Sequence, residues 1–176
     1  MKPVICILSL FLPLAAAAEN AVRGPVIANY GPTFEVADRD VNPPAGFVYK
    51  AVFDVTATGE ETGQISRRLE SVARFLNMHA RNGVAPERMQ LAVVLHGKAA
   101  RDALSNAAYQ SRYDTDNPNL ELMLALQKAG VRFYLCGQSA GFLGIKKAEL
   151  AEPVELALSA MTMLVELQSQ GYRLLP

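Results

Sequence analysis

The sequence predicts a three-layer α/β/α domain, in which a mainly parallel, five-stranded sheet has helices on both of its faces. The first observation is composition, because 51% of the 176 residues are apolar and mean hydropathy is +0.12, which is enough for a substantial core. The second is order, because segments of strand character alternate with segments of helical periodicity after Gly46. Strands joined through helices pair in parallel by right-handed crossovers, so this alternation predicts the architecture.

Residues 1–18 have the features of a secretory signal peptide. Lys2 is followed by an apolar run over 4–14 and by four alanines over 15–18. The run is shorter than the ~20 apolar residues that a membrane-spanning helix needs, so it is typical of a leader that is removed. We therefore expect cleavage after Ala18, a periplasmic or secreted protein, and no membrane span in the mature chain.

The stretch over 19–46 is a predicted extended arm, because it is rich in proline and glycine. We expect this arm to lie on the domain or on a neighbouring subunit, and residues 47–176 to form the α/β domain. Cleavage removes Cys6 and leaves Cys136 as the only cysteine, so no disulfide is expected within the mature chain.

The first strand is predicted over 47–55, which is rich in aromatic and β-branched residues. Thr58 and Glu61 have the spacing of a capping box, and the helix that follows is expected to end at Asn82-Gly83. Its apolar face is formed by residues at helical spacing: Ile65, Leu69, Val72 and Leu76. The nearly continuous apolar run over 89–95 predicts a second strand, covered on both faces.

The second half of the domain continues the alternation. Asn117 is the expected N-cap of a helix that has Pro118 at its first position and ends at Gly130. The other expected elements are a short helix over 99–109, strands over 131–136, 154–158 and 172–175, and a helix over 159–170. This last helix has more apolar residues than one sheet-facing stripe needs, which favours self-association.

Composition and motifs argue against several classes of function. Lys and Arg total 17 and Asp and Glu total 17, whereas a general nucleic-acid binder needs an excess of cations. No G-x-G-x-x-G follows the first strand and no P-loop is present, so no nucleotide cofactor is expected. The two histidines and the one mature cysteine do not have metal-ligand spacing, so no metal is expected either.

The candidate site lies where two predicted strands end, because ligands of open parallel sheets bind beyond the carboxyl ends of the strands. The second strand runs into His96-Gly97, and the third strand ends in Cys136. A helix that begins near Gln138 would favour a thiolate on Cys136, and His96 would assist from one or two strands away. Alternatively, Cys136 is a small buried hydrophobe, as free cysteines often are. Position alone leaves both interpretations open.

Residues 137–141 also match G-x-S-x-G, the nucleophile elbow of α/β-hydrolases. Those enzymes place the histidine after the serine, whereas His79 and His96 both precede Ser139. A serine hydrolase is therefore not expected. His79 lies close to the apolar stripe of its helix, which favours a structural role.

The segments described above resemble the DsrE/DsrF-like family, specifically its exported single-domain branch. The match covers nearly all of the mature chain in order, through segments 49–55, 72–79, 93–99, 117–119, 133–139 and 159–172. The resemblance implies a five-stranded parallel α/β/α fold of flavodoxin-like appearance, assembled as trimers or hexamers. Sulfur-relay members carry sulfur as a persulfide on one cysteine after the strand that matches 131–136, and by position that cysteine is Cys136.

Two hypotheses of function follow. In the first, Cys136 accepts sulfane sulfur and passes it to an acceptor thiol, so that the protein is a sulfur carrier or a sulfurtransferase with a thiol or sulfur-donor protein as partner. His96 then moves protons or orients the ligand, and the N–H groups of Gly137 and Gln138 stabilise the anion. In the second, the protein is a non-catalytic oligomeric module that binds a small ligand and buries Cys136. The other candidate binding residues are Gly97, Ser139, Asn77 and Asn117.

Overall fold

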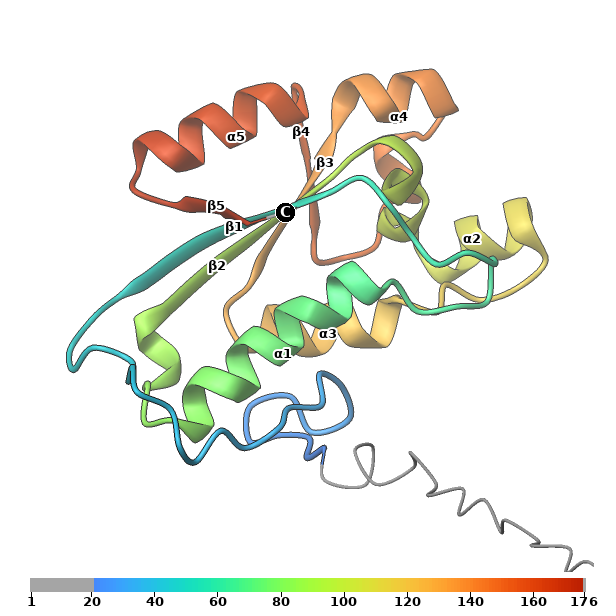
Figure 1. Ribbon diagram of the computed structural model, residues 1–176. Coiled ribbons are helices and arrows are strands. Elements are labelled where there is room, and N and C mark those ends of the chain that lie inside the picture. Colours follow the sequence, from blue (N-terminus) through green and yellow to red (C-terminus); the bar gives the residue numbers. More distant parts are fainter. Residues whose placement is uncertain (1–20, 176) are drawn as a thin grey trace, which may run out of the picture.

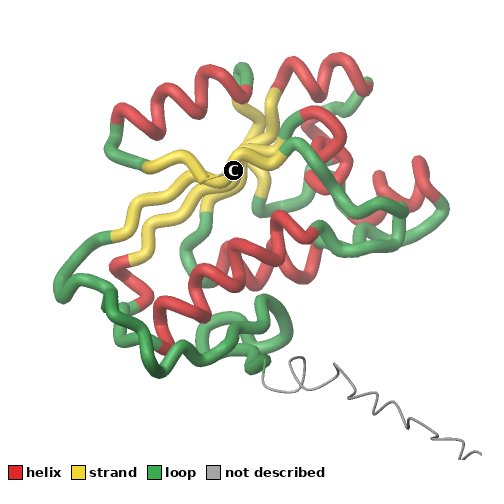
Figure 2. The backbone as a smooth tube through the Cα atoms, in the orientation of Figure 1, coloured by secondary structure: helices red, strands yellow, loops and turns green. Residues whose placement is uncertain are grey.

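The computed structural model describes residues 21–175, so the predicted leader and its cleavage site lie outside the described residues. Five strands form one sheet in the order β4-β3-β2-β1-β5, and every neighbouring pair is parallel. The strands are β1 Tyr49–Val55, β2 Met89–Leu95, β3 Arg132–Cys136, β4 Val154–Ala157 and β5 Arg173–Leu175. The predicted parallel sheet is confirmed. Its strands are drawn in yellow in Figure 2.

Helices connect the consecutive strands and cover both faces of the sheet (Figure 1). The α-helices are α1 Arg67–Arg81, α2 Asn106–Tyr113, α3 Leu120–Lys128, α4 Gly137–Leu143 and α5 Ala160–Ser169. The 3-10 helices are η1 Pro86–Arg88, η2 Gly97–Ala103 and η3 Lys147–Glu149. The helix predicted over 99–109 is thus two shorter helices, η2 and α2, with extended backbone at Leu104 and Ser105 between them.

The order of the strands explains why α5 lies opposite to α1 and α3. The chain moves in one direction from β1 to β4 and then returns across the whole sheet to β5, beside β1. Right-handed crossovers place connections that move in opposite directions on opposite faces. Because α5 makes the return, it crosses the other face and packs over β1, β2 and β3. The predicted three layers are confirmed.

The alternation of side chains along each strand divides the apolar residues between two cores. Odd-numbered residues such as Phe53, Leu95 and Leu135 pack in the larger core, on the face of α1 and α3. Even-numbered residues of the same strands pack in a smaller core against α5. Cys136 belongs to this even-numbered set and therefore faces α5.

The predicted capping box at Thr58 and Glu61 is wrong. Helix α1 begins after Ser66, whose hydroxyl accepts a hydrogen bond from the N–H of Leu69. The hydroxyl of Thr58 donates instead to the buried carboxylate of Asp102, at 2.5 Å. The side chain of Thr58, which the local pattern assigned to a helix cap, thus bonds to a residue far away in the sequence.

The predicted N-cap at Asn117 is wrong for a similar reason. Helix α3 begins after Asn119, two residues later. The buried amide of Asn117 donates to the carbonyls of Asp102 and Leu104, at 2.8 and 2.6 Å. Asn117 therefore ties its loop to the end of η2.

The arm begins with a loop that lies against α1, drawn in blue in Figure 1. The fully buried amide of Asn77 holds this loop. Its Oδ1 accepts hydrogen bonds from the N–H groups of Val26 and Ile27, at 3.1 and 2.8 Å. Its Nδ2 donates to the carbonyls of Ile27, Tyr30 and Gly31, at 2.9 to 3.1 Å. Asn77, a candidate binding residue in the sequence, thus has its polar atoms occupied by the arm.

Gly31 allows the arm to approach the helix this closely. Its φ is +64°, and a Cβ at this position would lie 2.3 Å from the backbone nitrogen of Arg74. Only glycine fits such a contact and such a conformation. The arm is therefore held on α1 by the amide of Asn77, by the close approach of Gly31 and by hydrogen bonds from the guanidinium groups of Arg74 and Arg81 to its carbonyls, rather than by apolar burial alone.

Replacing Asn77 by Ala should release the arm. The substitution leaves buried N–H and carbonyl groups of the arm without partners, and each such group costs about 1–3 kcal/mol. We expect the free energy of unfolding, measured with urea, to fall by roughly 3 kcal/mol or more. The arm should also become sensitive to protease in the native protein.

The matched control is Asn29→Ala, because Asn29 is an exposed asparagine of the same arm. This substitution should change stability by less than about 0.5 kcal/mol. Equal stability of the two variants would show that the Asn77 hydrogen bonds do not hold the arm.

Candidate functional site

Cys136 lies where adjacent connections leave the sheet toward opposite faces. The chain beyond β3 enters α4, and Ala140 and Ile145 of this connection pack in the larger core. The chain beyond the neighbouring strand β4 enters α5, on the opposite face. Such a divergence opens a crevice at the carboxyl ends of the strands, which is where open α/β sheets bind their ligands.

A close backbone contact fixes the turn that follows Cys136. A Cβ at Gly137 would lie 2.6 Å from the carbonyl oxygen of Ala157 and 3.0 Å from that of Leu158. The side-chain amide of Gln138 also donates to the carbonyl of Leu158, at 3.3 Å. The absence of a side chain at Gly137 therefore lets the start of α4 pack against the segment that leads into α5.

The sulfur of Cys136, a residue that is 5% exposed, lies near N–H and hydroxyl groups at the starts of both helices. Burial raises the pKa of this thiol. The opposing effect comes from the N–H and hydroxyl groups of Ser139 and from the N–H groups of Ala160 and Gln138. Together these donors outweigh burial, and the pKa lies below the ordinary value of a cysteine. The environment therefore favours the thiolate, which is the nucleophilic form.

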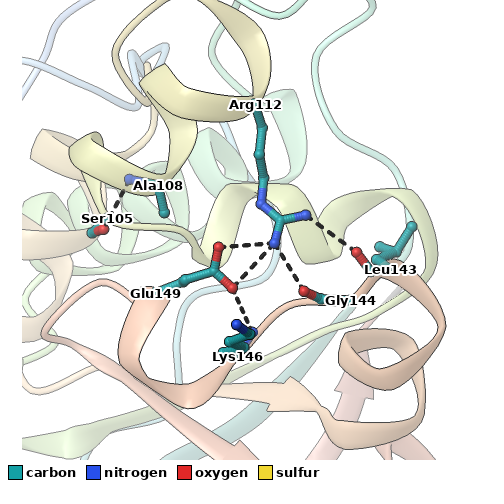
Figure 3. A network of polar contacts seen from close by, with 7 residues as sticks. All are labelled: Ser105, Ala108, Arg112, Leu143, Gly144, Lys146 and Glu149. Carbon is teal, nitrogen blue, oxygen red and sulfur yellow. Dashed lines mark hydrogen bonds and ion pairs between the residues drawn. The ribbon is translucent and has the colours of Figure 1, made fainter.

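Arg112 of α2 holds the far end of α4 in place (Figure 3). Its guanidinium donates to the carbonyls of Leu143 and Gly144, at 3.2 and 2.9 Å. It also pairs with the carboxylate of Glu149, at 2.8 Å. Because the last carbonyls of α4 are fixed, the first turn of this short helix keeps its position beside Cys136.

His96 follows the strand next to Cys136, but its imidazole bonds elsewhere. Strands β2 and β3 are direct neighbours, so no strand lies between the two residues. Nε2 of His96 lies 2.6 Å from Oδ1 of Asp54 on β1. In the part of the chain that the structure describes, no hydrogen bond joins this ring to Cys136. The polar groups that stabilise the thiolate thus come from α4 and α5 rather than from His96.

A pocket of about 430 Å³ opens at the same edge of the sheet. Its lining consists of Gly97, Lys98, Gln138, Ser139, Phe142 and Leu143. The hydroxyl of Ser139 accepts a hydrogen bond from the N–H of Gly97, at 3.1 Å, and so joins the loop after β2 to α4. Three of the predicted binding residues, Gly97, Gln138 and Ser139, therefore meet at this pocket, whereas Cys136 and His96 are not among its lining residues. The apolar part of the lining and the ammonium of Lys98 suit a small anionic or thiol-bearing molecule.

Asn77 and Asn117 do not join this site, since both are buried and used in hydrogen bonds to the backbone. Asp54 and Ala160 do belong to it, although the sequence analysis missed both. Asp54 had a detectable signal, because it is a carboxylate within an otherwise apolar stretch of strand. Ala160 had no signal, because its contribution is a backbone N–H.

Within residues 21–175, no group of three or more His, Cys, Asp or Glu side chains is placed to hold a metal ion. No helix in this same part of the chain combines the length and the apolar character that crossing a membrane requires.

Comparison with known proteins agrees with the fold. The profile of the DsrE/DsrF-like family matches residues 50–176. The solved structure of MTH1491, a protein of unknown function from Methanobacterium thermoautotrophicum, is similar with a TM-score of 0.54 and 21% identity, over 72% of this chain and 97% of that one. The ychN protein of E. coli has a TM-score of 0.48 and 16% identity, also over 72% of this chain and 97% of its own. Among curated proteins, none matches the chain.

Replacing Ser139 by Ala should make Cys136 less reactive near neutral pH. The variant loses the hydroxyl that helps to lower the thiol pKa, so the pKa should rise. A plot of the iodoacetamide alkylation rate against pH should therefore move to higher pH, with a slower rate at pH 7. Ser169→Ala, at an exposed serine of α5, is the control and should give the wild-type curve. Superimposable curves for all three proteins would contradict a role for Ser139.

Proposed function

The chain belongs to the DsrE/DsrF-like family, and from this premise we propose that it is an exported sulfur-handling protein that carries sulfane sulfur as a persulfide on Cys136. The family is linked to sulfur relay, which supports the class of chemistry. The observation that carries the proposal is the thiol of Cys136, whose pKa is lowered by donors from two helices at the edge where ligands bind. The leader-like residues 1–18 support action in the periplasm or outside the cell.

The proposed loading step is a sulfur transfer without net oxidation. The Cys136 thiolate attacks the outer sulfur of a donor persulfide, R–S–SH. The bond between the two donor sulfurs breaks, the bond to Cys136 forms, and the donor leaves as the thiolate R–S⁻, which takes up a proton. The N–H groups that lower the thiol pKa would equally stabilise the persulfide anion on Cys136. Delivery to an acceptor thiol is the same step in reverse.

A different function is favoured by one observation, the low exposure of Cys136 at 5%. A cysteine so covered could be part of the packing beneath a pocket that only binds a small ligand. In that alternative, the protein is an oligomeric binding module without sulfur transfer. The reactivity of the native thiol separates the two functions.

Incubating the native mature protein with polysulfide should add the mass of one sulfur atom, measured by intact mass spectrometry. A thiol reductant should remove the added mass, because persulfides are reversible modifications. Cys136→Ser should gain no mass, and the control Ser169→Ala should gain as much as the wild type. Modification of Cys136 only after denaturation would refute sulfur carriage and favour the binding module.

The intact mass of exported protein also tests cleavage of the leader. Exported protein that still begins at Met1 would contradict cleavage after Ala18.

We also propose that copies of this chain associate through α4, the end of β4 and α5. Large apolar side chains are exposed there: Phe142 by 91%, Leu158 by 72%, Met161 by 75% and Val165 by 68%. Neighbouring exposed apolar residues of this size usually mark an interface. The trimer or hexamer implied by the family resemblance would cover them.

Sedimentation at micromolar concentration should therefore detect an oligomer of the mature protein. The double substitution Met161→Glu and Val165→Glu should shift the protein toward the monomer, because it places two charges in the proposed interface. Val41→Glu is the control, because Val41 is 82% exposed on the arm and should leave the oligomer intact. A monomer in the wild-type protein would refute this interface.

A further inference from the structure

Asp54, His96 and Cys136 lie on one face of the sheet, at the ends of three adjacent strands. Side chains at even-numbered positions of β1, β2 and β3 face α5, as Val52, Val94 and Cys136 show. Asp54 is two residues beyond Val52, and His96 is two residues beyond Val94, with extended backbone at His96. The three side chains therefore share the α5 face.

The register of the strands brings His96 next to Cys136. Leu95 pairs with Leu135 across β2 and β3, so the next position in each chain aligns His96 with Cys136. Neighbouring strands are about 4.8 Å apart. On the other side of His96, Asp54 lies on β1, and its Oδ1 is 2.6 Å from Nε2 of the ring. His96 is thus between a carboxylate on one strand and the thiol on the other.

We propose that Asp54 is a positioning residue, which holds the imidazole of His96 so that the ring exchanges a proton at the Cys136 edge. This inference rests on the proposed sulfur chemistry, and it assigns a role to Asp54 that neither the sequence motifs nor the family match assigns. Aspartate is disfavoured in strands, and β1 is otherwise apolar around this position. In the part of the chain that the structure describes, the ion pair with His96 is the only polar contact of the Asp54 carboxylate.

The carboxylate determines which ring nitrogen carries the proton. An ionised carboxylate only accepts hydrogen bonds, so Nε2 must be the donor to Asp54. In the neutral ring Nδ1 is then the acceptor, and in residues 21–175 it has no other hydrogen-bond partner. Asp54 thereby leaves Nδ1 as the nitrogen that takes up and returns protons.

The proton balance of sulfur loading gives this nitrogen a function. The Cys136 thiol gives its proton to Nδ1, and the thiolate attacks the outer sulfur of R–S–SH. The sulfur–sulfur bond of the donor breaks, and R–S⁻ takes the proton back from Nδ1 to leave as R–SH. The sum is that Cys136–SH and R–S–SH become Cys136–S–SH and R–SH, with His96 restored. The carboxylate of Asp54 stabilises the intermediate imidazolium.

Other charged or titratable groups face this region, so their effects on Cys136 must be distinguished from the effect of Asp54. Tyr134 lies on β3 on the same face, Glu155 lies beside it on β4, and Lys98 lines the pocket. Glu155 is a useful control residue. Its carboxylate is exposed, it pairs with Tyr134 across β3 and β4, and it makes no bond to His96. Removing the charge of Glu155 therefore tests how a nearby carboxylate affects Cys136 when the position of the His96 ring is unchanged.

The experiment compares alkylation of Cys136 by iodoacetamide in wild type, Asp54→Asn and Glu155→Gln. If only local charge mattered, removing either carboxylate would favour the thiolate and accelerate alkylation. Positioning predicts the opposite sign for Asp54→Asn alone, namely a rate at pH 7 slower by about fivefold or more, a small part of what a positioned base can contribute. Glu155→Gln should react at least as fast as the wild type.

Nitrogen-15 NMR of the His96 ring measures which ring nitrogen is protonated, a property that a purely structural role of Asp54 would leave unchanged. The wild-type ring should be protonated on Nε2 when neutral, and Asp54→Asn should give a mixture of tautomers. Circular dichroism establishes whether each variant is folded. If Asp54→Asn is not folded, the tautomer of the wild-type His96 ring alone tests the positioning role of Asp54. Alkylation of Asp54→Asn as fast as that of Glu155→Gln, or a wild-type ring protonated on Nδ1, would overturn the proposal.

The same proteins distinguish this inference from the proposed function. If the wild type takes up no sulfur from polysulfide but Asp54→Asn slows alkylation as expected, sulfur carriage fails and the positioning of His96 stands. If the wild type takes up sulfur and Asp54→Asn alkylates at or above the wild-type rate, sulfur carriage stands and the positioning role fails.

Discussion

The contact of Gly137 with the end of β4 is the constraint on which the site depends. The carbonyl oxygens of Ala157 and Leu158 occupy the space that any side chain at residue 137 would need. Because the chain can turn there without a side chain, α4 begins directly after Cys136 and next to the start of α5. One sulfur atom thus lies near N–H groups of two helices that depart to opposite faces of the sheet.

This arrangement follows from topology as much as from local contacts. The return of the chain from β4 to β5 requires α5 to cross the face that the earlier connections leave free. The N-terminus of α5 therefore lies at the carboxyl edge beside β3, where it supplies the N–H of Ala160. Burial and donors act in opposite directions on the thiol, and a site that is both covered and rich in N–H groups can hold an anion that water would otherwise have to solvate.

The carboxyl edge is also held by side chains that bond to neighbouring segments. Arg112 binds the last carbonyls of α4 (Figure 3). Ser139 joins α4 to the loop after β2. On the far side of the larger core, Asn77 seats the arm on α1. These polar side chains connect segments far apart in sequence, so the apolar cores are accompanied by a small number of specific long-range hydrogen bonds. Such bonds keep donors in place without help from a bound ligand.

The sequence by itself determined the alternating order of strands and helices, and it placed His96 directly after β2 and Cys136 at the end of β3. A nearly continuous apolar run located β2 over Met89–Leu95, and the apolar segment over 131–136 placed β3 to within one residue, because the apolar character of a strand is a local property of the sequence. The glycines after His96 and Cys136 likewise marked the edge where the site lies.

Only the tertiary structure decided which groups those residues meet. Thr58 and Asn117 have the local spacing of caps, but buried partners near η2 take their side chains. His96 turns to Asp54 rather than to Cys136, because a strand end has neighbours on both sides and register alone does not choose between them. The donor from Ala160 is a backbone N–H, which every residue except proline carries. No sequence pattern can mark such a group until the return of α5 brings it to the sulfur.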